Sequence, residues 1–140
     1  VGRFITEAAR VLRPGGLLAV VNEMVLRSRL RGKKADRQRE AGEYVNTFEK
    51  LRDPSHNRCL SHEEWLDALV AEGLTVEAHE TLDKRLTFET WAARHTPEMQ
   101  TRLRVLLLRA PEVAAEFLDA RTDAGLTTFR LREGVYLARK

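Results

Sequence analysis

Residues 4–21, FITEAARVLRPGGLLAVV, decide the fold that this sequence predicts. Apolar residues recur at helical spacing in the first half of the stretch and indicate a helix with one buried face. Pro14 cannot continue the helical hydrogen bonds, and Gly15 and Gly16 permit a tight reversal of the chain. The run Leu17 to Val21 is too short for a helix and does not alternate, which is typical of a strand covered on both faces.

A strand covered on both faces predicts a parallel sheet, and ligands of such sheets bind at the carboxyl ends of the strands. Asn22 and Glu23 come directly after the predicted strand. We therefore expect both side chains to make polar contacts with a substrate.

The helix, the LRPGG turn and the LLAVV strand together resemble the late segment of class I S-adenosylmethionine-dependent methyltransferases. The resemblance is to the methyltransferase type 11 and ubiquinone/menaquinone-biosynthesis groups. Three later stretches fit the same family in the same order: EKLRDPSHNR at 49–58, SHEEWLDALVAEGL at 61–74 and VYLARK at 135–140. This resemblance implies an α/β fold, the C-terminal half of a Rossmann-like methyltransferase fold. About three strands are expected, the last of them antiparallel, with several helices.

The sequence departs from the family at the cofactor site. Family members open with a strand that ends in an acidic-x-Gly-x-Gly loop, but this sequence has no Gly-x-Gly and begins at Val1 instead of Met. We interpret residues 1–140 as a single partial domain. The resemblance then implies S-adenosylmethionine as the cofactor, bound mostly by residues upstream of this chain, so we assign no cofactor-binding residue here. It also implies substrate-side insertions at 24–57 and 87–125.

Composition predicts one modest hydrophobic core, because 43% of the 140 residues are hydrophobic and 32% are charged. Cys59 is the single cysteine, which excludes an intrachain disulfide and a cysteine-based zinc cluster and suits a reducing cytoplasm. The histidines show no metal-ligand spacing, so no metal site is expected. No apolar stretch approaches the length of about 20 residues that a membrane span needs.

A basic segment at 27–39 carries seven lysines and arginines around Gly32. It lacks the interleaved aromatic residues that stack on bases, which argues against nucleic acid, and we predict a solvated loop or frayed helix. The alternative function is a non-catalytic α/β interaction module that binds RNA or an acidic partner through this segment. A third alternative is a remnant that only completes the fold of a neighbouring chain.

His56 is the candidate catalytic residue. The spacing of apolar residues predicts a helix from Gly42 to Arg52, which the following Asp-Pro pair ends, and His56 lies just beyond this rigid turn. A histidine facing the cavity beyond the strand ends could accept a proton near neutral pH. The alternative is that His56 only bonds to backbone and pins the loop. Arg58 is a candidate partner for an acidic group of the acceptor.

The helix at 61–74 has the best-defined ends, with the Ser61/Glu64 spacing of a capping box. His62 in its first turn is expected to face solvent. Trp91 and Met99 are predicted to pack in the core, with a place in the wall of an acceptor pocket as the alternative.

The resemblance also implies a strand order. It places 135–139 between Leu17 to Val21 on one side and 74–82 on the other, and it leaves an open edge on the first strand. Such an edge predicts self-pairing, so a homodimer through the sheet edge is possible. The predicted function is methyl transfer to a small-molecule acceptor when the protein is intact. This chain would supply the acceptor-side half and would be inactive alone.

Overall fold

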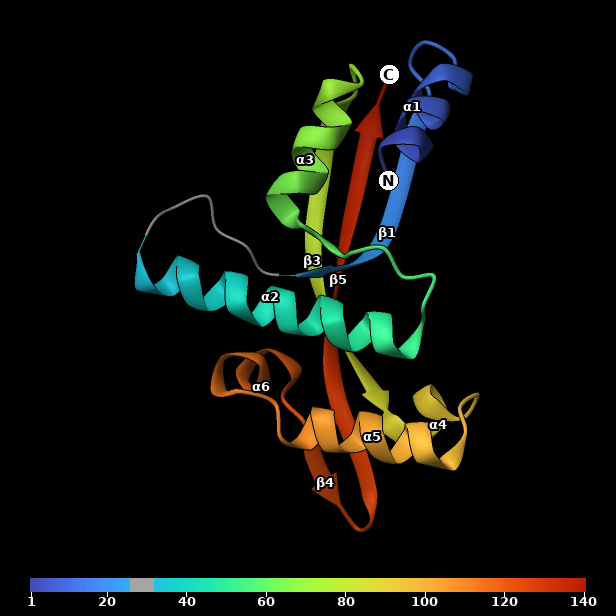
Figure 1. The fold of residues 1–140 in the computed structure, drawn as a ribbon. Helices are drawn as coiled ribbons and strands as arrows, with labels where there is room; N and C mark the ends of the chain where they lie inside the picture. The colour runs from blue at the N-terminus through green and yellow to red at the C-terminus, as the bar shows by residue number, and fades with distance from the viewer. Residues whose placement is uncertain (26–31) are drawn as a thin grey trace.

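The computed structural model describes residues 1–25 and 32–140, which form a mixed α/β structure (Figure 1). The elements in these ranges are, in chain order, α1 (Gly2–Val11), β1 (Leu17–Val25), α2 (Lys33–Arg52), β2 (Leu60–Ser61), α3 (His62–Ala71), β3 (Thr75–Thr87), α4 (Phe88–Ala92), α5 (Pro97–Leu108), α6 (Glu112–Leu118), β4 (Arg121–Asp123) and β5 (Leu126–Arg139).

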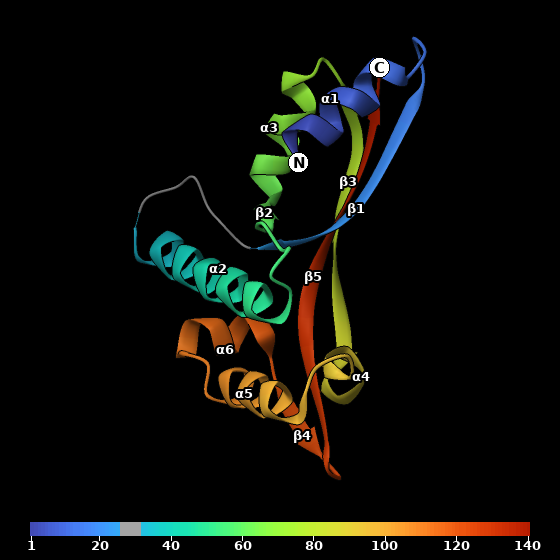
Figure 2. The same ribbon diagram turned by 45° about the vertical axis from the view of Figure 1, so that its right-hand side comes forward.

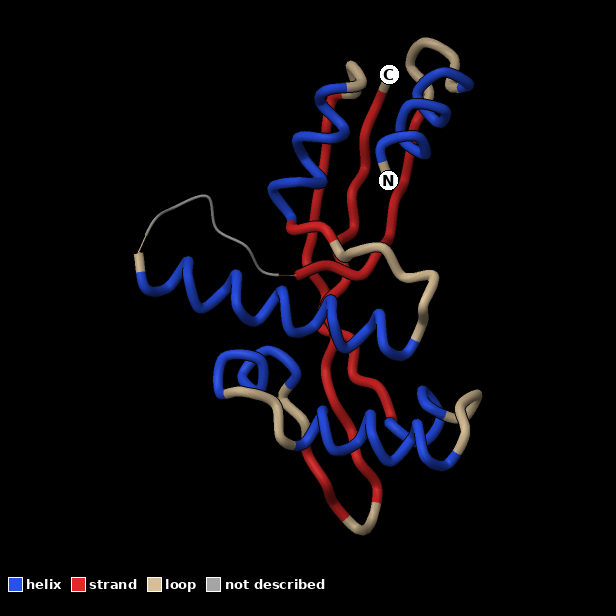
Figure 3. The backbone as a smooth tube through the Cα atoms, in the orientation of Figure 1, coloured by secondary structure: helices blue, strands red, loops and turns tan. Residues whose placement is uncertain are grey.

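Strand β5 lies in the middle of the sheet and runs antiparallel to both of its long neighbours, β1 and β3 (Figure 3). This confirms the predicted order of the three strands. Two short strands are added to it: β2 pairs in parallel with the end of β1, and β4 forms a hairpin with β5. Strand β5 begins well before the predicted 135–139 and is continuous over Leu126–Arg139.

Helices α1 and α3 lie beside the upper half of the sheet, as Figure 2 shows. Their buried residues Ile5, Trp65 and Leu69 share a hydrophobic cluster with Val20 of β1 and Tyr136 of β5. The capping box of α3 is present as predicted, since the Ser61 hydroxyl accepts from the Glu64 backbone and the Glu64 carboxylate accepts from the Ser61 backbone.

The second face of this upper half carries exposed apolar side chains. Leu17 is 44% exposed, Val21 59% and Leu82 of β3 42%. The prediction that Leu17 to Val21 is covered on both faces is therefore wrong for the described chain, because none of its helices packs against this second face.

The lower half of the sheet packs against α2, α4, α5 and α6. Phe129 and Leu131 of β5 are buried there with Phe48, whereas Tyr136 and Ala138 are buried in the upper half. Alternate residues of a strand point to opposite faces, and β5 pairs without a register shift with β3 over 128–137 and with β1 over 132–139. The two hydrophobic clusters therefore pack against opposite faces of β5.

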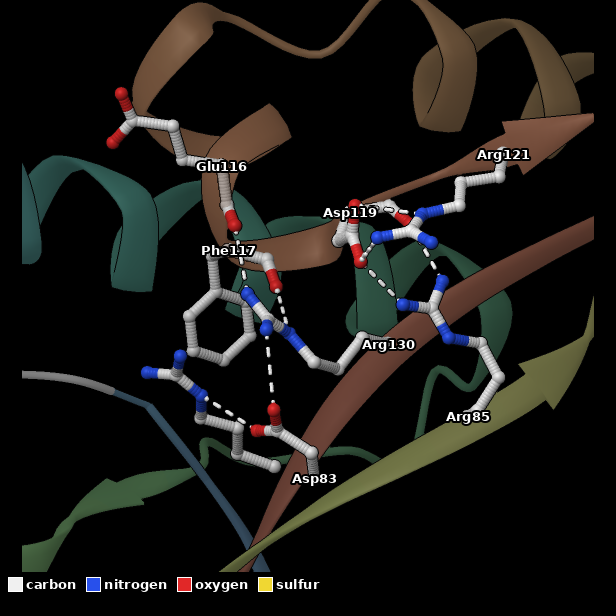
Figure 4. Close-up of polar contacts among 8 residues, drawn as sticks. Asp83, Arg85, Glu116, Phe117, Asp119, Arg121 and Arg130 are labelled. Atoms are coloured by element: carbon white, nitrogen blue, oxygen red, sulfur yellow. Dashed lines mark hydrogen bonds and ion pairs between the residues drawn. The ribbon is translucent and has the colours of Figure 1, made fainter.

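Helix α6 is tied to the ribbon of β3 and β5 by arginine side chains (Figure 4). Arg130 of β5 donates to the backbone carbonyls of Glu116 (2.8 Å) and Phe117 (3.0 Å) in the last turn of the helix. A cation at a helix C-terminus satisfies carbonyls that have no helical partner and opposes the helix dipole. Asp119, just beyond the helix, receives ion pairs from two further arginines, Arg85 and Arg121.

Helix α2 is longer than predicted, because it begins at Lys33 and not at Gly42. Its first half consists largely of residues with good helix propensity. Arg37 is also held to α6, 3.2 Å from Glu112 and 2.9 Å from Glu116. The described part of the basic segment is thus a packed helix and not a loop, while its residues 27, 29 and 31 lie outside the described residues.

The outer edge of β1 is open along 17–23 within the described ranges, since β2 pairs only with Met24 and Val25. Phe4 and Val11 of α1 are exposed. The homodimer through this edge stays a prediction. None of the helices in the described ranges has the length and apolar character needed to cross a membrane.

Gly134 has a packing role in the centre of β5. A Cβ atom placed there would lie 2.5 Å from Oη and 2.6 Å from Cε2 of Tyr136, so the tyrosine ring occupies the space of the missing side chain. The same ring lies 5.6 Å from Trp65 and 5.5 Å from His62, centroid to centroid. A residue other than glycine would displace this stack.

We expect Gly134→Ala to lower the free energy of unfolding by about 1–3 kcal/mol, because the added methyl overpacks a buried site. Urea unfolding of the chain measures this. Gly2→Ala is the matched control, since no atom lies within 4 Å of a Cβ at Gly2. Equal stability of the two variants would contradict this account of Gly134.

Candidate functional site

The candidate site lies where the second half of β1 meets the carboxyl half of α2. Asn22 and Glu23 do not follow the strand as predicted, because β1 continues to Val25. They pair with Gly134 and Glu133 and point to opposite faces of the sheet. Only Glu23 shares the site described next.

The carboxylate of Glu23 acts electrostatically on groups of three other segments. Burial or a direct hydrogen bond has the larger effect on each pKa, and the charge of Glu23 acts in the raising direction on Glu49 of α2, on His56 and Cys59 of the following loop, and on Lys84 of β3. Glu133 lies directly opposite Glu23 across the strands, and Lys84 pairs with Glu133 at 2.6 Å. This lysine offsets the repulsion between two like charges in register.

His56 is fixed by a hydrogen bond from its Nε2 to Oδ1 of Asn46, at 3.1 Å. The same oxygen accepts from the backbone N–H of Cys59 (2.6 Å), while Asn46 Nδ2 donates to the Gly42 carbonyl (3.0 Å). Asn46 Oδ1 is therefore an acceptor, so Nε2 of His56 carries the proton. The neutral ring keeps its lone pair on Nδ1.

Burial lowers the pKa of His56, and the charges of Arg52 and Lys50 act in the same direction, while Glu23 opposes them. At neutral pH the ring is accordingly uncharged and able to accept a proton. The backbone of His56 is also held, because its N–H donates to the Asp53 carbonyl (2.8 Å) and its carbonyl accepts from Lys50 (3.2 Å). These backbone hydrogen bonds agree with the interpretation that His56 pins the loop, and its role as a base stays a prediction.

Glu49, three residues after Asn46 on α2, is a buried carboxylic acid. Its side chain is 1% exposed, and Oε2 pairs with Arg52 at 2.9 Å. Oε1 is buried and has no hydrogen-bond partner among the described residues. Burial raises the pKa of Glu49 to about 7, although the charge of Arg52 acts in the opposite direction. A carboxyl group with such a pKa can donate or accept a proton near neutral pH.

Arg58 is held in a two-point ion pair with Glu64, with both nitrogen–oxygen distances at 3.0 Å. It lines a pocket of about 280 Å³ between α2 and the start of α3, together with Asn46 and Val25. Asn46 thus separates this pocket from His56. Arg58 is accessible there, but its first role is to hold the capping carboxylate of α3.

Cys59 is not a candidate nucleophile. Burial, reinforced by the charges of Glu23 and Glu49, raises the pKa of its thiol to about 12, so the reactive thiolate is not formed at neutral pH. The described residues contain no group of three or more side chains that could hold a metal ion.

Two predictions outside the site have different outcomes. His62 is half-buried and does not face solvent as predicted, because Nδ1 lies 3.2 Å from the Tyr136 hydroxyl and its ring contacts His79. Trp91 stacks on Phe48 at 5.1 Å, and Met99 packs against the same core cluster. This is the core role predicted for both.

Sequence reasoning missed Glu49 and Asn46. Glu49 follows Val45 by one helical turn and therefore lies beside the apolar stripe of α2, which was the available signal. Asn46 carried no comparable signal, because its partners His56 and Cys59 come from a loop whose path the sequence does not fix.

Comparisons with known proteins agree on the fold. No family model matches the chain. A curated relative, the uncharacterized protein YafE of Escherichia coli strain K12, is 34% identical over 99 residues, which is 70% of this chain and 43% of that protein. The chain therefore spans less than half the length of this relative.

Two solved structures superpose on nearly the whole chain. A "putative methyltransferase" from Bacillus halodurans C-125 has a TM-score of 0.81 at 27% identity, covering 99% of this chain and 62% of its own. The YcgJ protein of Bacillus subtilis has a TM-score of 0.82 at 21% identity, covering 99% of this chain and 57% of its own.

The raised pKa of Glu49 predicts a pH dependence of stability. Between the ordinary value of 4.5 and about 7 the folded chain binds one proton more than the unfolded chain, so stability falls as pH rises through this window. The full loss is about 3 kcal/mol. Urea unfolding at pH 5 and pH 8 measures it, and Glu49→Gln should remove this part of the slope. If the free energy of unfolding of the Glu49→Gln variant changed with pH as it does in the original chain, the carboxyl of Glu49 would have its ordinary pKa.

Proposed function

Because the chain has a methyltransferase fold, we propose that the protein transfers a methyl group from S-adenosylmethionine to a small-molecule acceptor. In this proposal residues 1–140 supply the acceptor side. The observation that carries it is the superposition of 99% of the chain on the Bacillus halodurans structure, with a TM-score of 0.81. The fold alone does not name a reaction, so the proposal also rests on the Glu23, Glu49 and His56 group.

The side chains at this site suit the charge of the cofactor. S-adenosylmethionine, when bound, supplies an electrophilic methyl group on a positively charged sulfur. Glu23 would balance that charge. The cations of this region are already engaged, Lys84 by Glu133, Arg52 by Glu49 and Lys50 by the His56 carbonyl. We propose that the remaining cofactor contacts come from residues outside 1–140.

His56 is the proposed base. Its Nδ1 would take the proton from the oxygen, nitrogen or acidic carbon of the acceptor as that atom gains its methyl group. Asn46 keeps the ring oriented through Nε2, and Glu23 would stabilise the imidazolium that forms. The proton then leaves to solvent when the product departs. Asn22 lies on the opposite face of β1, so we no longer assign it to this site.

The interaction module with a basic segment is the weaker alternative. In the described part of that segment Arg37 pairs with Glu112 and Glu116, and Arg39 pairs with Asp36. The neighbouring carboxylates reduce the net positive charge that this part of the segment presents to RNA or an acidic protein.

His56→Ala in the full-length protein should lower the methylation rate by about 100-fold or more while leaving the affinity for S-adenosylmethionine unchanged. Single-turnover kinetics and a binding titration measure the two quantities. His79→Ala is the matched control, because His79 is exposed and lies outside this site. An unchanged rate would remove His56 from the mechanism.

Residues 1–140 alone should give no saturable heat when titrated with S-adenosylmethionine, because most of the proposed cofactor contacts lie elsewhere. Isothermal titration calorimetry of the chain and of the full-length protein makes the comparison. Tight binding of S-adenosylmethionine by residues 1–140 alone would overturn the proposal that most cofactor contacts lie outside them. No binding by the full-length protein would overturn the proposed reaction.

A further inference from the structure

A second pocket lies on the other flank of α2, between its first half and α6. Its volume is about 410 Å³, a size typical of small-molecule sites. Three apolar side chains line it, Ala41 from α2 and Val113 and Phe117 from α6. The Glu49 and His56 group lies at the opposite end of α2, so this pocket is distinct from the proposed methyl-transfer site.

The charged residues around this apolar lining are three cations, Lys34 and Arg37 of α2 and Arg132 of β5, and one carboxylate, Glu116 of α6, which pairs with Arg37. The three cations differ in what already neutralises them. Arg132 pairs with Asp83 at 3.1 Å and lies over the Phe117 ring at 5.3 Å, so it forms part of the wall. Within the described ranges the ammonium group of Lys34 makes neither an ion pair nor a hydrogen bond, so its charge is available to a ligand.

The pairs made by Arg37 are easily exchanged. Its partners Glu112 and Glu116 have side chains that are 79% and 64% exposed. Ion pairs this exposed contribute little stability in water. A ligand carboxylate entering the pocket could therefore share Arg37 at small cost while pairing with Lys34.

We propose that the α2/α6 pocket binds an amphiphilic monocarboxylate, with its apolar body against Val113 and Phe117 and its carboxylate at Lys34. One available cation matches one negative charge, which favours a carboxylate over a doubly charged phosphate. The apolar lining favours a body of several carbons, because each buried methylene contributes about 0.8 kcal/mol. The pocket also gives a role to the described part of the basic segment.

The probe is octanoate, compared with octanol, which lacks the charge, and acetate, which lacks the apolar body. Calorimetric titration of residues 1–140 should show saturable binding of octanoate and at least tenfold weaker binding of both comparison compounds, roughly the effect of one charge-assisted contact or of a few methylenes. Equal affinity for octanol, or no saturation by octanoate, would overturn the proposal.

Variants locate the site. Lys34→Met should weaken octanoate binding by about fivefold to tenfold and leave octanol unchanged, whereas the neighbouring Lys33→Met, which lies outside the pocket lining, should change neither. Val113→Phe should fill the pocket and remove octanoate binding, with circular dichroism showing that the variant is folded. Equal effects of the two lysine variants would refute the assignment. These titrations need no methyl transfer, so their outcome is independent of the proposed reaction.

Discussion

Strand β5 is hydrogen-bonded on both edges along most of its length, to β1 on one side and to β3 on the other. The rest of the structure depends on this double pairing. Helices α1 and α3 pack against one face of β5, and the four remaining helices meet the other face further along the strand. Gly134 lies where the buried residues of β5 change from one face of the strand to the other. Its backbone is covered by the ring of Tyr136 instead of by a side chain of its own.

The changeover between the two faces also creates the candidate site. Glu23 is opposite Glu133, one residue from Gly134, at the level where the upper half of the sheet gives way to the lower half. Here α2 brings Asn46 and Glu49 toward the strand. An ionisable side chain reaching this boundary loses water on one side while keeping a charged neighbour on the other. The loss of water raises the pKa of Glu49 and lowers that of His56, whereas the charge of Glu23 acts to raise both.

Local sequence signals predicted much of this fold. The Pro-Gly-Gly turn and the capping box at Ser61 each depend on neighbouring residues, and the structure has both. The central place of β5 came from the resemblance to methyltransferases, because strand order depends on contacts distant in sequence. The length of β1 was underestimated, since polar Asn22 and Glu23 interrupt its apolar run but not its hydrogen bonding.

The candidate site was predicted less completely than the fold. His56 and Glu23 were singled out because each follows a recognisable local feature. Asn46 and Glu49 were not, since their roles arise only when α2 packs on the sheet and the loop folds back to it. A burial of this kind depends on tertiary contacts that no single stretch of the sequence contains.

The central position of β5 has a consequence for how the chain acquires its structure during synthesis. The ribosome makes β1 and β3 well before β5, yet these two strands do not pair with each other. Neither strand can therefore form its pairs with β5 until that segment has been made and inserts between them. Such late, long-range closure makes the emerging chain dependent on protection from aggregation, for which chaperones are suited.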